Sequence, residues 1–228
     1  MSPLPGPAAR GEKDPGTRDL IARRAARLLR PGWVVNLGIG IPTLLAKHLD
    51  PDEIHLHTEN GLLGVGPPPS PAEANPYLVD ASKKLVTRRS GASLFDSAAS
   101  FAMLRGGHVD AAVLGGLQVD EVGILANWSV PGEPVLGVGG AMDILAGVRT
   151  IIVAMTHSAA EGAPKLVRRC TLPVTSVRPV DFVVTELATF RREERGLALV
   201  DLAPGVTEAD VRTRTEAAYA VALERGMP

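Results

Sequence analysis

The chain has 228 residues, of which 45% are hydrophobic and 21% are charged, and its formal net charge is −1. This composition is typical of a globular protein, and a nearly neutral chain lacks the electrostatic footprint of a nucleic-acid binder. No apolar run approaches the roughly 18 residues that a membrane helix needs, so neither nucleic acid nor membrane is an expected partner. The single cysteine, Cys170, excludes an internal disulfide and is interpreted as a structural thiol. Together with the absence of a signal-peptide core, it favours a cytoplasmic location.

Residues 1–16 are rich in Pro, Gly and Ala and are predicted to form a flexible leader, followed by one domain over residues 17–228. Thr17 is the expected N-cap of an amphipathic helix that runs to about Arg30 and is broken by Pro31-Gly32. The basic residues of this helix are predicted to form a solvated face, with phosphate or partner binding as the alternative. They are Arg23, Arg24, Arg27 and Arg30.

Apolar runs alternate with helical patterns along the rest of the chain. Buried strands are predicted over Trp33–Leu37, Ile54–Thr58, Val109–Leu114, Thr150–Met155, Phe182–Val184 and Leu197–Leu202. Helices are predicted over Thr43–Leu49, Ser93–Leu104 and Thr207–Glu224, the last with Thr207 and Asp210 in a capping spacing. The alternation predicts an α/β fold with a single open, mainly parallel sheet layered with helices.

Three glycine-rich segments are candidates for ligand contact: Gly38–Pro42, Asn60–Gly66 and Gly137–Gly140. Glycine lets backbone N–H groups approach a ligand closely, and loops at the carboxyl ends of strands are where α/β sheets bind ligands. The first segment lacks the third glycine of a dinucleotide fingerprint, and Pro42 is expected to interrupt the helix start. The stretch Asn60–Pro69 is predicted to be an irregular loop over a site, too rich in Gly and Pro for a sheet interior.

Glu59 lies at the end of a predicted strand, directly before Asn60-Gly61, a pair that favours a tight turn. A carboxylate at this position would project into the crevice above the sheet, although pattern alone leaves a solvated strand-end acid as the alternative. His55 and His57 share one face of the same strand, but two histidines without a third ligand make a poor metal site, and no metal is expected.

At Glu59 the chain also resembles a known family. The segments Asn36–Pro42 (NLGIGIP) and Thr58–Gly64 (TENGLLG) are similar to the B subunit of 3-oxoacid CoA-transferases. Further matching blocks lie at residues 101–110, 126–128, 139–143 and 165–173, in the same order and at matching spacings. The proline-rich segment Pro67–Pro71 and Ser176, where a Gly is common, depart from the family pattern without touching these segments. The proline-rich loop bears on which acid is accepted.

The resemblance implies a mechanism in which a glutamate carboxylate attacks an acyl-CoA and carries CoA as a transient thioester, with no permanently bound cofactor. By position, Glu59 matches the nucleophile, Gly140 matches a backbone donor to the oxyanion, and Asn36 and Lys83 match residues on the CoA side. The supporting loop residues are Gly38, Gly40, Asn60, Gly61 and Gly139.

The family also implies a partner, the A subunit of the CoA-transferase, in an A2B2 heterotetramer. The implied substrates are succinyl-CoA as the donor and either acetoacetate or 3-oxoadipate as the acceptor. Two alternatives stay open from the residues: a sugar-phosphate isomerase or deaminase of the same architecture, and a catalytically silent scaffold or ligand sensor.

Overall fold

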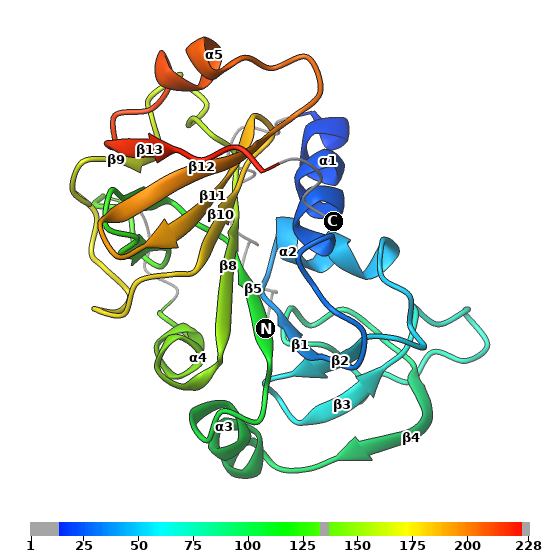
Figure 1. The fold of residues 1–228 in the computed structure, drawn as a ribbon. Helices are drawn as coiled ribbons and strands as arrows, with labels where there is room; N and C mark the ends of the chain where they lie inside the picture. The colour runs from blue at the N-terminus through cyan, green and yellow to red at the C-terminus, as the bar shows by residue number, and fades with distance from the viewer. Residues whose placement is uncertain (1–13, 133–136, 225–228) are drawn as a thin grey trace.

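The computed structural model describes residues 14–132 and 137–224. Its centre is a ten-stranded sheet (Figure 1). In sheet order the strands are β13 (Tyr219–Val221), β12 (Gly196–Leu202), β11 (Ala188–Glu193), β10 (Phe182–Val184), β8 (Thr150–Ala154), β5 (Ala111–Leu114), β1 (Val34–Leu37), β2 (His55–Thr58), β3 (Leu62–Val65) and β4 (Arg88–Leu94).

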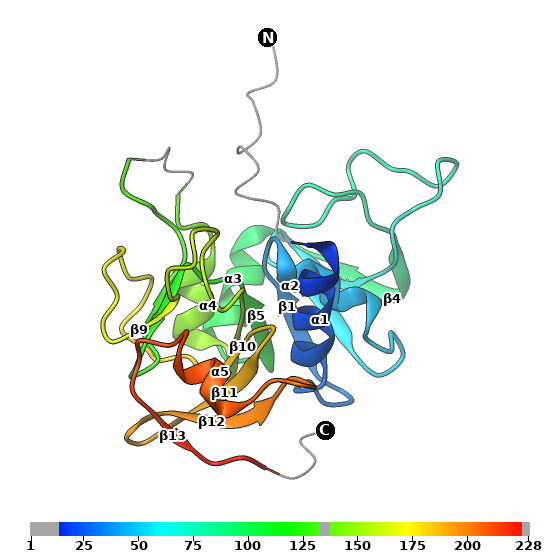
Figure 2. The same ribbon diagram turned by 90° about the horizontal axis from the view of Figure 1, so that it is seen from above.

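The five central strands, β10, β8, β5, β1 and β2, are all parallel, whereas antiparallel pairing joins β11 and β12 on one side and β3 and β4 on the other. Helices cover both faces (Figure 2). One side carries α1 (Pro15–Ala26), α2 (Ile41–Leu44) and the 3₁₀ turn η1 (Leu45–Lys47), and the other carries α3 (Ser97–Arg105) and α4 (Ala141–Gly147). The predicted α/β fold with a mainly parallel sheet is thereby confirmed.

The central strands are apolar on both faces because each face has its own core. In β5, Ala111 and Val113 pack in the cluster that contains α1, while Ala112 and Leu114 pack in the cluster that contains α3 and α4. Strand side chains alternate between faces, so a strand covered on both sides needs a continuous apolar run. This is why the runs at residues 109–114 and 150–155 indicated strands correctly.

A second, three-stranded sheet was not predicted. It consists of β7 (Leu125–Ala126), β6 (Gln118–Asp120) and β9 (Leu166–Val167). These strands are two or three residues long, too short to show a period of two in the sequence.

The N-terminal helix differs from its prediction at both ends. Its N-cap is Asp14, whose carboxylate accepts a hydrogen bond from the backbone N–H of Thr17, and the helix ends at Ala26. Residues 14–16 are thus not part of a leader, while residues 1–13 lie outside the described residues. Arg24 is also wrongly assigned to a solvated face, because it is buried and donates to Thr189 and to the carboxylate of Asp201.

Two predictions around Glu59 are wrong in an informative way. Pro42 does not interrupt a helix but lies in the first turn of α2, where its fixed φ is favourable. Residues 62–65 are not an irregular loop but strand β3, which forms a hairpin with β2. Next along the chain, Ser93 and Leu94 pair with β3 as the end of β4, so the following helix starts only at Ser97, capped by Asp96.

The closing helix over residues 207–224 is largely wrong. The capping box of Thr207 and Asp210 is present, but α5 spans only Glu208–Arg212. Residues Tyr219–Val221 instead form β13, an edge strand parallel to β12, and the Tyr219 ring packs edge-on against Phe190. Pairing and ring packing with residues distant in sequence outweigh the local helical pattern here. Within the described part of the chain, no helix has the length and apolar character needed to span a membrane.

Candidate active site

Glu59 directly follows β2, at the carboxyl end of the parallel strands. Thr58 pairs with Leu62, so residues 59–61 form the three-residue turn of the β2–β3 hairpin. Gly61 has a φ of +112°, and a Cβ added there would overlap the backbone oxygen of Phe95. Only glycine fits this position. The turn predicted at Asn60-Gly61 is therefore present, and it holds Glu59 at the carboxyl end of the parallel strands.

The Glu59 carboxylate lies against Gly140, the residue immediately before α4. The backbone N–H of Gly140 donates a hydrogen bond to it, and a Cβ added at Gly140 would overlap Oε2 of Glu59. Partial burial raises the pKa of Glu59 above its ordinary value, the Gly140 hydrogen bond lowers it, and the negative charge of Asp143 raises it further. The result is a half-buried carboxylate of increased basicity held by a backbone donor.

Asp143 is a residue near the site to which the sequence assigned no role. It lies in the first turn of α4, and its carboxylate accepts a hydrogen bond from Arg105, at the end of α3, over 2.9 Å. The guanidinium compensates part of the negative charge next to Glu59. Both residues belong to blocks that carry the family resemblance, but their proximity in space is not visible in the sequence.

Asn36 is buried on β1, directly opposite His57 of β2 in the strand register. Its amide nitrogen lies 3.1 Å from Nδ1 of His57 and 3.4 Å from the His57 carbonyl oxygen. On the other side of the ring, His57 Nε2 lies 3.1 Å from the hydroxyl of Ser100 on α3. Burial lowers the pKa of His57 to about 4. The imidazole is therefore neutral near pH 7.

The predicted supporting residues lie in loops near the carboxyl ends of the central strands. The backbone N–H of Gly38 donates to the carbonyl of Val113 on β5, and Gly40, with a φ of +93°, precedes α2. Gly139 has a φ of +57° and turns the chain toward Gly140. The Asn60 amide donates to the carbonyl of Val79 and so ties the segment between β3 and β4 to the residue beside Glu59.

Lys83 lies in that tied segment, in a tight turn organised by Asp80. The Asp80 carboxylate accepts hydrogen bonds from the backbone N–H groups of Ser82 and Lys84 and from the Ser82 hydroxyl. Lys83 itself is exposed and has a φ of +64°, which is uncommon for a residue other than glycine. The turn holds Lys83 at a defined place on the surface. The structure shows no direct contact between it and Glu59, so its role on the CoA side stays a prediction.

The remaining candidates from the sequence are the Cys170 thiol and the histidines considered as metal ligands. Burial raises the pKa of the Cys170 thiol to about 11, and its Sγ donates to the carbonyl of Ile124, as fits an unreactive structural thiol. Among residues 14–132 and 137–224, no three His, Cys, Asp or Glu side chains are grouped as a metal site.

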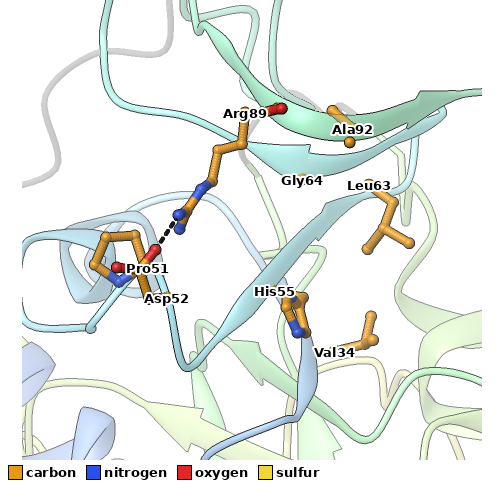
Figure 3. Close-up of a pocket in the computed structure, with 10 residues that line it drawn as sticks. Val34, Pro51, Asp52, His55, Leu63, Gly64, Arg89 and Ala92 are labelled. Carbon is orange, nitrogen blue, oxygen red and sulfur yellow. Dashed lines mark hydrogen bonds and ion pairs between the residues drawn. The ribbon is translucent and has the colours of Figure 1, made fainter.

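A cavity of about 400 Å³ lies at the other end of β2 (Figure 3). Leu63 and Gly64, from the glycine-rich segment Asn60–Gly66, line it, but none of the residues to which the resemblance assigns a role does. Its lining includes Val34 and His55, at the starts of β1 and β2, and Arg89 on β4, which pairs with Asp52.

Comparison with known proteins identifies the class to which this fold and site belong. The family model for coenzyme A transferases matches residues 18–213. The chain is 52% identical over 206 residues to the beta subunit of the acetate CoA-transferase of Escherichia coli strain K12, covering 90% of this chain and 94% of the relative. It is 46% identical to the B subunit of a probable succinyl-CoA:3-ketoacid coenzyme A transferase of Bacillus subtilis strain 168, covering 90% and 95%.

Among solved structures, the acyl-CoA transferase YdiF of E. coli O157:H7, in a thioester complex with CoA, superposes with a TM-score of 0.69 at 26% identity. The match covers 96% of this chain and 45% of that one, so the chain spans less than half of YdiF. This chain belongs to the coenzyme A transferase family.

Proposed function

We propose that this chain is the B subunit of a 3-oxoacid CoA-transferase and that Glu59 is its nucleophile. The observation that carries the proposal is the pairing of the half-buried Glu59 carboxylate with the backbone N–H of Gly140. A carboxylate that is ionised near neutral pH can attack a thioester without a general base. A rigid N–H beside it can stabilise the oxyanion that develops in the attack, an effect typically worth roughly 3 kcal/mol.

In the proposed reaction, a carboxylate oxygen of Glu59 attacks the acyl-CoA carbonyl, the C–S bond breaks, and CoA leaves as thiolate. The product is a mixed anhydride between the acyl group and Glu59. The thiolate then attacks Cδ of Glu59, releasing the donor acid as carboxylate and leaving a glutamyl-CoA thioester. An acceptor carboxylate reverses both steps, so no proton is gained or lost overall. YdiF, a protein of the same fold, has been solved in a thioester complex with CoA, which supports a thioester intermediate.

Succinyl-CoA is the proposed donor, and acetoacetate or 3-oxoadipate the proposed acceptor, in agreement with the name of the B. subtilis relative. Acetate is a second candidate acceptor, since the E. coli relative is named for it. The relatives are named as single subunits, which supports an A-type partner chain. The A2B2 assembly of the two chains is part of the proposal. The expected location is the cytoplasm, where the one thiol, Cys170, would stay unpaired.

The test is to incubate the purified A·B complex with succinyl-CoA and to analyse the intact chains by mass spectrometry. The mass of this chain should rise by that of CoA less one water, and peptide mapping should locate the adduct on Glu59. Borohydride should reduce the thioester and prevent its discharge. Adding acetoacetate, 3-oxoadipate or acetate to the isolated adduct then identifies which acid removes CoA.

The matched control is Glu53→Gln, which changes an exposed acid just before β2 and should leave adduct formation unchanged. Glu59→Gln should form no adduct. An adduct on another residue, or transfer by Glu59→Ala at the wild-type rate, would show the assignment to be wrong. Turnover of a sugar phosphate without any adduct would instead favour the isomerase alternative.

A further inference from the structure

His57 makes contacts that the proposed reaction does not use. It is 2% exposed, lies on β2, and precedes Glu59 by two residues. One ring nitrogen faces Asn36 on β1, the other faces Ser100 on α3, and the ring stacks on Phe95 at 6.0 Å between centroids. The imidazole thus contacts β1, α3 and Phe95 from a position two residues before the proposed nucleophile.

The partners of the ring determine which nitrogen carries the proton. The Asn36 amide nitrogen bears only hydrogens, so Nδ1 of His57 must accept. A neutral imidazole that accepts at Nδ1 carries its proton on Nε2, and this N–H donates to the Ser100 hydroxyl. The pKa of about 4 agrees with a neutral ring, since a charged ring would direct two donors at each other across the 3.1 Å contact.

The same contacts orient Asn36. Its amide nitrogen is directed at the ring and at the carbonyl of His57, so its oxygen, on the other side of the amide, faces away from His57. An amide side chain could otherwise turn over and exchange a donor for an acceptor. With His57 fixed by Ser100, only one of these orientations satisfies the buried ring nitrogen, and leaving a buried polar group unpaired is unfavourable.

We infer that His57 is a positioning residue: held by Ser100 in its Nε2–H tautomer, it sets the amide of Asn36 so that the amide oxygen faces away from the ring as an acceptor. This inference rests on the proposed function, in which Asn36 lies on the CoA side. It implies that the group of the acyl-CoA next to Asn36 is a hydrogen-bond donor, such as an amide N–H.

Two substitutions separate the two halves of the imidazole. His57→Asn places an amide oxygen close to the position of Nδ1, so it can still accept from Asn36 while losing the contact with Ser100. His57→Gln places an amide nitrogen close to the position of Nε2, so it can still donate to Ser100 but offers Asn36 no acceptor. Both remove the buried ring and its stacking on Phe95, so both are expected to lower thermal stability by similar amounts.

The rate of CoA adduct formation on Glu59 should distinguish the two variants. In the A·B complex, His57→Gln should form the adduct more slowly by on the order of 10- to 100-fold, the cost of misplaced groups at a reacting centre. It should also raise the KM for acyl-CoA. His57→Asn should stay within about threefold of wild type, the size expected for the loss of a single peripheral hydrogen bond. The matched control is His55→Gln, on the same strand and face but exposed, which should leave the rate unchanged.

A second measurement does not depend on catalysis. Nitrogen-15 NMR of the A·B complex, with histidines labelled only in this chain, reports the protonation of each ring nitrogen directly. His57 should show a protonated Nε2 and an unprotonated Nδ1 at neutral pH. A charged ring, a proton on Nδ1, or equal slowing in His57→Asn and His57→Gln would overturn the inference. If wild type forms no adduct on Glu59 at all, the proposed function fails, whereas the tautomer result still stands or falls separately.

Discussion

The two ends of β2 carry similar residues in opposite environments. At its start, His55 is exposed and lines an open cavity together with Arg89 and Gly91. At its end, His57 is buried between β1 and α3, and Glu59 lies against Gly140. The comparison shows that residue type alone does not define the site. Helices α3 and α4 meet the carboxyl end of the strand, and their packing converts a histidine and a glutamate into fixed, partly desolvated groups.

The largest expected effect of breaking this arrangement is that of Gly140→Ala. The added Cβ would overlap Oε2 of Glu59 and approach the Phe101 ring, so the carboxylate must leave the backbone donor. Adduct formation should fall on the order of 100- to 1,000-fold, as for the loss of an oxyanion donor. The measurement is single-turnover mass spectrometry of the A·B complex. Gly132→Ala, at a glycine with a φ of +84° and open space around it, is the comparison variant. Equal rates in the two variants would contradict the assigned contact.

The next effect concerns stability, and it contrasts Gly61, in the β2–β3 turn, with Gly91, on β4 beside the cavity. Gly61 and Gly91 both have positive φ, at +112° and +80°, but only Gly61 is closely surrounded, by the backbone of Phe95 and Asp96. Gly61→Ala should therefore cost about 4 kcal/mol or more, combining strain with a backbone clash, whereas Gly91→Ala should cost about 1 kcal/mol from strain alone. Chemical denaturation of the two variants measures the difference. Similar losses would mean that the Phe95 backbone moves readily.

These glycines also show what could be predicted from the sequence. The apolar runs identified the central strands, and the ordered family blocks singled out Glu59 and Gly140. Glycines also misled the prediction of β3, because Gly61 and Gly64 suggested an irregular loop. Their positive φ values are compatible with the β2–β3 turn and with the register shift between β3 and β4. The contact between His57 and Ser100 joins residues 43 positions apart, and the one between Asp143 and Arg105 spans 38. Such pairs depend on how α3 and α4 pack, which a local pattern does not contain.

The buried histidine, His57, predicts a pH dependence of stability. The pKa of His57 is about 4 in the folded chain against 6.5 as its ordinary value, so the unfolded chain takes up the proton first as the pH falls. Its contribution, on the order of 3 kcal/mol, is complete above pH 6.5 and lost progressively toward pH 4. Glu59 acts in the opposite direction, because its pKa is raised on folding.

The contribution of His57 is therefore isolated by comparing unfolding free energies of wild type and His57→Gln across this range. The wild type should lose more stability between pH 6.5 and pH 4 than the variant does. His55→Gln, the matched substitution at the exposed end, should follow the wild-type profile. Parallel profiles for wild type and His57→Gln would contradict a buried, neutral His57.

The smallest effects on stability should come from two ion pairs, one near each end of β2. The two pairs should contribute similarly to stability and differ in their effect on Glu59. Asp52 pairs with Arg89 beside the cavity, and Asp143 pairs with Arg105 beside Glu59, all with substantial exposure. Asp52→Asn and Asp143→Asn should each cost at most about 1 kcal/mol. Only Asp143→Asn removes a negative charge that raises the pKa of Glu59. Since the nucleophile must be ionised, the acid limb of adduct formation should move to lower pH in that variant and stay in place in Asp52→Asn. The pH profile of single-turnover adduct formation measures this, and an unmoved limb in Asp143→Asn would show that Arg105 already cancels the charge of Asp143 at Glu59.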